Sequence, residues 1–152
     1  MFLDEVNRKI LRLLQKNARM SNTELADKVN LSATPCLRRL KRLQEDGFIE
    51  GYSAIINKKA IGLNVSAFVF ANLEKNTKES GDLFESELRK LPEVTECCVV
   101  TGRYDYVLRV VTRDLETYDK FIKEKLANID SIANLESMII LNQNIEKNEL
   151  PI

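Results

Sequence analysis

Residues 31–43 read LSATPCLRRLKRL, and this stretch decides how the N-terminal part of the chain folds. Its apolar residues recur at the spacing of one helix face, namely Cys36, Leu37, Leu40 and Leu43. Four cations fall within positions 38–42, and no acidic residue occurs between Asp27 and Glu45. The stretch predicts a helix with an apolar underside and a cationic outer face that suits a phosphate backbone. A basic helix that is merely solvated shows the same charge pattern, so the neighbouring sequence must decide.

The ends of this helix are marked by residues with known terminal preferences. Ser32 is a good N-cap, because its hydroxyl can accept a backbone N–H of the first turn. Pro35 falls in that first turn, where the N–H that it lacks would have had no partner. Gly47 ends the helix.

The sequence before this helix favours a DNA-binding arrangement. Ser21-Asn22-Thr23-Glu24 is a capping box that opens a short helix, and Asn30-Leu31 forms a tight turn before the basic helix. An earlier helix is capped by Asp4 and has its apolar positions at Val6, Ile10, Leu13 and Leu14. A short helix, a tight turn and a basic helix make up the helix-turn-helix motif, and the extended residues 48–56 are a candidate wing.

Roles in DNA binding follow from position along the basic helix. The residues nearest its N-terminus are candidates for base contact, namely Thr34, Pro35, Arg38 and Arg39. Lys41 and Arg42 lie further along and suit phosphates. Ser21, Asn22 and Ser32 are at helix starts, where backbone N–H groups can touch the DNA backbone, although capping alone explains the two serines. Arg39 and Arg42 have an alternative, which is to pair with Glu45 or Asp46.

Charge and composition separate two modules. Residues 1–60 hold 12 Lys and Arg against 7 Asp and Glu, a net charge of +5, and the remainder is −5 because the whole chain is neutral. A basic front module suggests a polyanionic partner. No apolar run is long enough for a membrane span, and the first residues are not a signal peptide, so a cytoplasmic protein is expected.

Composition argues against catalysis. The chain has no histidine, no phosphate-binding glycine loop and three cysteines without metal spacing, which read as small apolar residues in a reducing compartment. Carboxylate pairs such as Asp82 and Glu85 read as a solvated helix surface. We therefore expect no enzyme, no metal and no cofactor.

The second module alternates strands and helices. Residues 57–64 (NKKAIGLN) read as a linker. Strands are expected at 65–73, 94–101, 106–112 and 137–141, with helices at 77–91 and from Asp114 to Leu126. The helices' apolar positions are Leu83, Phe84, Leu88 and Leu91 in the first, and Leu115, Tyr118, Phe121, Ile122 and Leu126 in the second. This order is the α+β ferredoxin-like βαββαβ fold, whose open sheet face needs a cover, so a homodimer or higher oligomer is expected.

The chain resembles the leucine-responsive regulatory (Lrp/AsnC, feast/famine) family of transcriptional regulators over nearly its whole length. The segments that carry the resemblance are LDEVNRKIL, SNTELADKVNLS, CLRRLKRLQEDGFIEGY and TGRYDYVLRV. It implies a winged helix-turn-helix domain (1–56), a linker (57–64) and a βαββαβ domain (65–152) that binds a small amino acid and drives assembly. Members of the family pair into dimers on double-stranded DNA and often assemble to octamers.

The resemblance also implies an effector site between neighbouring subunits, near the turn at 101–106. The candidates are Thr101, Gly102, Tyr104 and Asp105, with Ser137 on the last strand facing them. Gly102 would let backbone N–H groups approach a carboxylate, and Asp105 would hold an α-ammonium group. A normal hairpin loop also uses Gly and Asp in these places. Two departures from the family pattern are Arg103, where many relatives have an acid, and the tail 142–147 (NQNIEK), which lacks a Val-Lys pair.

These observations predict a sequence-specific transcriptional regulator whose DNA binding or assembly responds to an amino acid, with leucine or methionine favoured over polar ones. An alternative is a nucleoid-type architectural protein that packs DNA without a ligand, and affinity for specific against nonspecific DNA separates the two. A sensor with a vestigial DNA module is a third reading, and the intact cationic helix argues against it.

Overall fold

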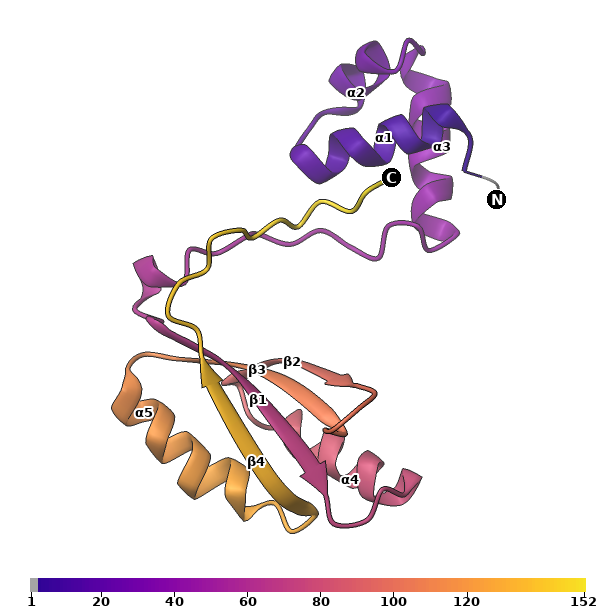
Figure 1. Cartoon of the computed structure of the whole chain (residues 1–152). Helices are drawn as coiled ribbons and strands as arrows, with labels where there is room; N and C mark the ends of the chain where they lie inside the picture. The colour runs from indigo at the N-terminus through magenta and orange to yellow at the C-terminus, as the bar shows by residue number, and fades with distance from the viewer. Residues whose placement is uncertain (1–2) are drawn as a thin grey trace. The chain divides into compact units, whose positions relative to one another are not determined.

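The structure is a computed structural model that describes residues 3–152, and these residues divide into two compact units. The N-terminal unit contains the described residues up to Ile55 together with Ile145–Ile152, and the sheet unit contains Ile56–Asn144 (Figure 1). The expected boundaries differ from this division at two places. Residues 57–64 belong to the sheet unit, and the last eight residues belong to the N-terminal unit.

The N-terminal unit has three helices: α1 (Glu5–Lys16), α2 (Asn22–Lys28) and α3 (Ala33–Glu45). The expected caps of the first two are confirmed. The Asp4 carboxylate accepts the Asn7 backbone N–H at 2.8 Å, and Ser21 and Glu24 form the reciprocal capping box. Apolar side chains from all three helices share one core, namely Ile10, Leu11, Leu14, Leu25, Ala26, Val29, Cys36 and Leu43.

One expectation for this unit was wrong. Ser32 occupies the N-cap position of α3, but its side chain makes no capping hydrogen bond. Residues 49–57, which include most of the candidate wing, form neither helix nor strand in the single chain. Tyr52 and Ile55 in this segment are 50% and 79% exposed.

The sheet unit has the expected βαββαβ order. Its elements are β1 (Val65–Leu73), α4 (Lys78–Leu88), β2 (Val94–Val99), β3 (Tyr106–Thr112), α5 (Leu115–Lys120) and β4 (Ile132–Ile139). The chain continues from α5 through one π-helical turn (Phe121–Lys125) and one 3-10 turn (Leu126–Asn128). All neighbouring strands are antiparallel, in the order β2-β3-β1-β4.

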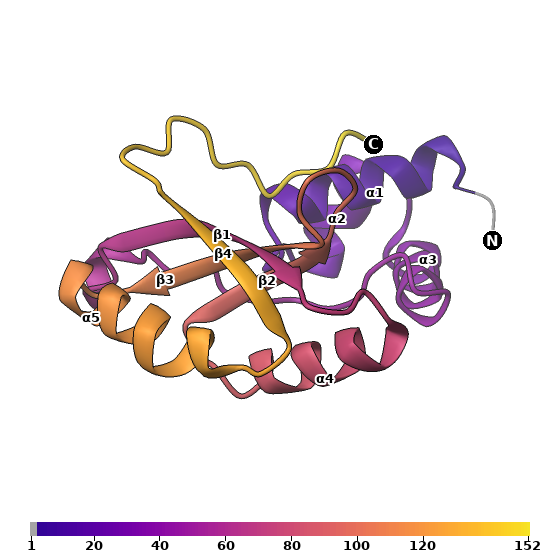
Figure 2. The same ribbon diagram turned by 60° about the horizontal axis from the view of Figure 1, so that its bottom comes forward.

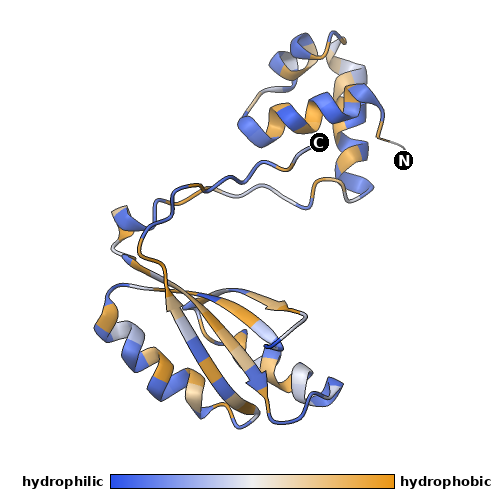
Figure 3. Cartoon of the chain, viewed as in Figure 1, coloured by the Kyte–Doolittle hydropathy of each residue, from blue (hydrophilic) through white to orange (hydrophobic). Residues whose placement is uncertain are grey.

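Several boundaries differ from the sequence-based expectation. The helix expected at 77–91 ends at Leu88, and the strand expected at 94–101 ends at Val99. The last strand, expected at 137–141, begins five residues earlier, at Ile132. The sequence did not indicate this start because hydrophilic residues interrupt the hydrophobic ones along β4 (Figure 3).

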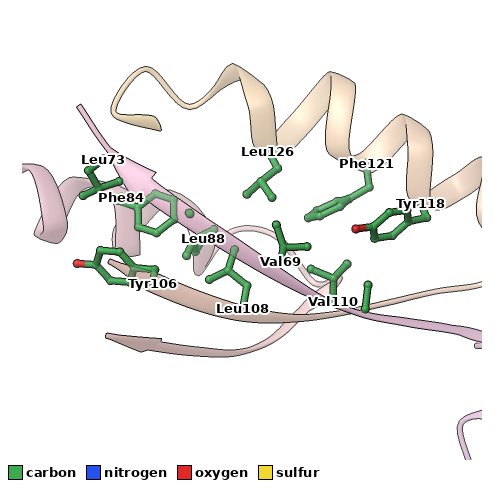
Figure 4. Close-up of a cluster of buried hydrophobic side chains, with 12 residues drawn as sticks. Val69, Leu73, Phe84, Leu88, Tyr106, Leu108, Val110, Tyr118, Phe121 and Leu126 are labelled. Atoms are coloured by element: carbon green, nitrogen blue, oxygen red, sulfur yellow. The ribbon is translucent and has the colours of Figure 1, made fainter. Parts of the chain in front are cut away.

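Both helices cover the same face of the sheet, and the core lies between them and the strands (Figures 2 and 4). Fully buried side chains on this face include Val69 and Leu108 from the strands and Phe84, Phe121 and Leu126 from the helical segments. Leu83 and Leu115 were expected in this core, but they are 54% and 59% exposed. The opposite face has no helix and carries Phe68, Phe70 and Met138.

Candidate DNA-binding helix and hairpin site

Helix α3 presents part of its cationic surface without neutralising partners. Arg38 and Lys41 are exposed, and within residues 3–152 neither side chain has an ion-pair partner. The helix is held by its apolar side, where Cys36 and Leu43 are fully buried. Leu37 was expected on that side and is 41% exposed. The buried side fixes α3, so that Arg38 and Lys41 face solvent.

Arg39 has a partner that the sequence did not predict. Its guanidinium donates to the Asp4 carboxylate at 2.6 Å and to the side-chain oxygen of Asn7, which is buried, at 3.1 Å. The Asn7 backbone N–H and then Arg39 lower the pKa of Asp4 below its ordinary value. Arg39 therefore joins α3 to α1, in place of the alternative pairing with Glu45 or Asp46. The sequence offered no signal for a pair separated by 35 residues.

Arg42 follows the alternative reading in part. Its Nε lies 3.9 Å from the Asp46 carboxylate, one helical turn away, and its side chain is 65% exposed. A pair this long and exposed contributes little to stability. The Arg42 side chain therefore stays accessible to a phosphate.

The turn that leads into α3 is held by a hydrogen bond from a side chain of α2 to the backbone of α3. The Asn22 side-chain amide donates to the carbonyl of Ala33 at 2.9 Å, and Asn30 adopts the left-handed conformation with φ of 56°. The Ser21 hydroxyl is occupied by the capping box, which also lowers the pKa of Glu24. Ser32 and Thr34 are exposed at the start of α3, and Pro35 is half-buried.

The turn between β2 and β3 is the second candidate site. Thr101, Gly102 and Arg103 are exposed, whereas Tyr104 and Asp105 are half-buried. Gly102 has φ of 116°, which an L side chain rarely adopts. A Cβ at Gly102 would meet nothing within 4 Å, so the backbone angle and not crowding requires glycine.

Asp105 ties this turn to the end of β1. One carboxylate oxygen accepts the Leu73 backbone N–H at 2.9 Å, and the other accepts the Asn76 side chain at 2.8 Å. The Asp105 backbone N–H donates to the Asn72 side chain at 3.1 Å. These bonds support the alternative in which Asp105 stabilises the loop, since both of its oxygens already have donors.

Tyr104 lies in a charged and aromatic cluster on the open face of the sheet. Its ring is 5.0 Å from the ring of Phe70, and the Arg103 guanidinium lies 5.2 Å above it. The Tyr104 hydroxyl donates to Glu136, and this bond raises the pKa of Tyr104. Arg103 is 3.8 Å from the same carboxylate. The sequence reading missed Glu136 because it began the last strand one residue too late to include it.

Ser137 points away from this cluster. Successive residues of a strand face opposite sides of the sheet. Glu136 lies on the open face, so Ser137 lies on the helix-covered face. The Tyr118 hydroxyl donates to Ser137 at 2.8 Å, which confirms that orientation. The expectation that Ser137 faces the turn was wrong.

The part of the chain that the structure describes shows no cluster of metal-ligating residues and no helix long and apolar enough to cross a membrane. Partial burial beside Glu85 raises the pKa of the Cys97 thiol to about 11, and burial also raises the pKa of Cys36. Raised pKa values make both thiols poor nucleophiles at neutral pH.

Comparison with known proteins agrees with this architecture. A winged helix-turn-helix DNA-binding family matches residues 3–50, and the Lrp/AsnC ligand binding domain matches residues 66–150. The chain belongs to the Lrp/AsnC family. The leucine-responsive regulatory proteins of Klebsiella pneumoniae and Escherichia coli K12 are each 35% identical to it over 150 residues, which is 99% of this chain and 92% of theirs.

Solved structures of Lrp/AsnC relatives have the same fold. A transcriptional regulator from Neisseria meningitidis in complex with L-Met is 33% identical, with a TM-score of 0.94 over 99% of this chain and 97% of that one. The feast or famine regulatory protein of M. tuberculosis, complexed with L-methionine, is 28% identical, with a TM-score of 0.89 over 98% and 99%. The chain is thus a DNA-binding transcriptional regulator, and the predicted family and fold class are confirmed. The architectural alternative gains no support.

Proposed function

We propose that this regulator recognises a specific duplex through α3 and changes its DNA affinity or assembly when a small apolar amino acid binds. The observation that carries the first part is that Arg38 and Lys41 are exposed and have no ion-pair partner within residues 3–152, on a helix that is fixed by its opposite side. L-methionine in two related structures supports the second part.

We assign roles on α3 by position and accessibility. Arg38 contacts base edges with Thr34 and Pro35, because the first residues of a recognition helix enter the major groove. Lys41 and Arg42 contact phosphates. Asn22 and Ser32 offer backbone N–H groups at helix starts to the DNA backbone, whereas the Ser21 N–H donates to Glu24 in the capping box. Arg39 positions the helix. A protein that binds chromosomal DNA in this way works in the cytoplasm.

The effector role of the hairpin is assigned from its accessible groups. Thr101 and Gly102 are exposed, and their backbone N–H groups suit a carboxylate. Asp105 shapes the loop, so we assign the α-ammonium group to Glu136, the carboxylate beside Tyr104. Methionine or leucine suits the aromatic surface of Phe70 and Tyr104.

A second copy of the chain would cover the open face of the sheet. Phe68 and Met138 are 37% and 50% exposed there, and burial of such side chains favours association. We propose a homodimer with further assembly, up to an octamer, that brings hairpins of neighbouring subunits together.

The experiment has two stages. A duplex is first selected from random sequence by the full-length protein, and its Kd is compared with that of a scrambled duplex at one salt concentration. A preference of at least about 10³-fold supports specific recognition, whereas equal affinities support an architectural protein. Each of the twenty amino acids is then added while DNA affinity and particle mass are measured. If none changes either quantity, the effector part of the proposal is wrong.

A further inference from the structure

The last eight residues of the chain form a contact that the function above does not use. Residues 145–152 (IEKNELPI) have no helix or strand, yet they belong to the N-terminal unit. The end of this segment lies beside α1 in both views (Figures 1 and 2). The question is whether α1 carries a binding site for this segment.

Two polar side chains of α1 bind the backbone of the segment. The Gln15 amide donates to the Leu150 carbonyl at 3.3 Å, and its oxygen accepts the Leu150 backbone N–H at 2.5 Å. Arg12 donates from Nε to the Ile152 carbonyl at 2.5 Å. Gln15 thus satisfies both backbone groups of one residue, as a neighbouring β-strand would. Such a site recognises an extended peptide by its backbone.

Apolar contact adds selectivity at one position. Ile152 is half-buried and packs against the core of the N-terminal unit. Leu150 is 70% exposed, and Ile145 is 75% exposed, so neither provides the anchor. Pro151 restricts the backbone before Ile152 and lowers the entropy lost on docking. The ligand class is an extended segment whose last apolar side chain packs against the core.

The segment follows β4 along the chain, after residues 140–144. The Arg109 guanidinium donates to the Gln143 side chain at 3.0 Å within the sheet unit, and Leu150 is bonded by Gln15 within the N-terminal unit. Residues 144–149 separate these two contacts. Binding of the segment is intramolecular, which favours it over a free peptide of the same sequence.

The same strand carries Glu136, which binds Tyr104 and Arg103 of the hairpin. The stretch from β4 to the end of the chain therefore contacts both the hairpin and α1, and a physical connection of this kind is what coupling between the two places requires.

We propose that the Arg12–Gln15 face of α1 is a peptide-binding site occupied by the chain's own residues 145–152, and that this contact transmits the state of the hairpin to the N-terminal unit. The transmission part rests on the proposed effector response. The binding-site part does not.

Crosslinking tests the occupant. Lys16→Cys, next to Gln15, and Leu150→Cys are combined in a full-length chain that carries Cys97→Ala and Cys98→Ala, so that the Gln15 side chain keeps its bonds to the Leu150 backbone. Cys36 stays because it is fully buried. A short bis-maleimide should join the two new thiols within one chain. The control replaces Lys16→Cys by Lys9→Cys, about 10 Å away along α1. Three outcomes would overturn occupancy by the chain's own segment. They are absence of the intramolecular product, an equal yield in the control, and crosslinked dimers in place of the intramolecular product.

The variant Gln15→Ala tests transmission, with Lys16→Ala as the matched control at the next exposed position. In hydrogen exchange, Gln15→Ala should lose protection at Leu150, whose N–H bonds Gln15. Its DNA affinity without amino acid should stay within about twofold of wild type, because α3 is unchanged, while the response to L-methionine falls by at least about fivefold. A full response would overturn transmission. A wild-type chain that ignores all twenty amino acids would refute the proposed function and transmission with it, while crosslinking and exchange still decide the binding site.

Discussion

Arg38 and Arg39 are adjacent in sequence, yet replacing each by alanine should have opposite consequences. Arg38 is exposed without an ion-pair partner in residues 3–152, so Arg38→Ala should leave stability unchanged within about 0.5 kcal/mol. Loss of a bidentate base contact costs about 1–3 kcal/mol, which weakens specific binding roughly 5- to 150-fold. Binding to nonspecific DNA should change far less.

Arg39→Ala should act through folding. The pair with Asp4 is partly exposed, at 35% and 44% for the two side chains, so it contributes less than about 1 kcal/mol after solvent screening. The Asn7 oxygen is buried and also loses a donor, which brings the total to about 1–2 kcal/mol. For a unit of this size, that corresponds to a Tm lowered by about 4–16 °C.

The assays are fluorescence anisotropy with the selected duplex and thermal unfolding of the same preparations. Arg38→Lys is the control that keeps the charge and loses the bidentate geometry, so it should recover nonspecific but not specific affinity. If Arg38→Ala lowered Tm as much as Arg39→Ala, or if Arg39→Ala alone removed specificity at unchanged Tm, the division of roles between the two arginines would be wrong.

Three further outcomes are expected. The pKa of Asp4 is lowered in the folded protein, so its stabilising effect is complete above its ordinary pKa and is lost as pH falls through the folded pKa. In urea titrations between about pH 7 and pH 3, Asp4→Asn should therefore lose less unfolding free energy than wild type. Gly81→Ala would place a Cβ 2.7 Å from the Tyr106 hydroxyl, so it should lower the Tm of the wild-type protein. In a Tyr106→Phe background, which lacks that hydroxyl, the same substitution should raise Tm because alanine reduces the entropy of the unfolded chain. Equal Tm shifts in the two backgrounds would contradict the clash. Asn30→Ala should cost about 1 kcal/mol in unfolding free energy because of its left-handed backbone, whereas Asn30→Gly should cost no more than a few tenths.

Local rules were sufficient for most of the fold. The caps at Asp4, Ser21 and Asp114 depend on residues three positions apart, and all three are present. The bounds of β1 and β3 agreed because both strands are mostly apolar and rich in β-branched and aromatic residues. The predicted start of β4 was wrong because Asn134 and Glu136 interrupt its apolar pattern on the open face.

The site was less predictable because its side chains meet across long separations in sequence. From the sequence alone, Arg39 is interpreted as one more cation of a basic helix, and only the fold shows that Asp4 and Asn7 lie beside it. Glu136 reads as an isolated surface acid until β4 pairs with β1, which lies between it and the hairpin. Spacing along one helix or strand carries no information about such partners.

The bonds that hold the turn before α3 have a thermodynamic consequence. The capping box at Ser21, the Asn22 amide on the Ala33 carbonyl and the settled backbone of Asn30 fix this corner in the unliganded chain. Little ordering is then left for the moment of encounter with a duplex. When the heat of DNA binding by the N-terminal unit is measured at several temperatures, the heat-capacity change should accordingly match the surface buried by rigid-body docking. It should lack the larger negative heat-capacity change that a segment gives when it folds on binding.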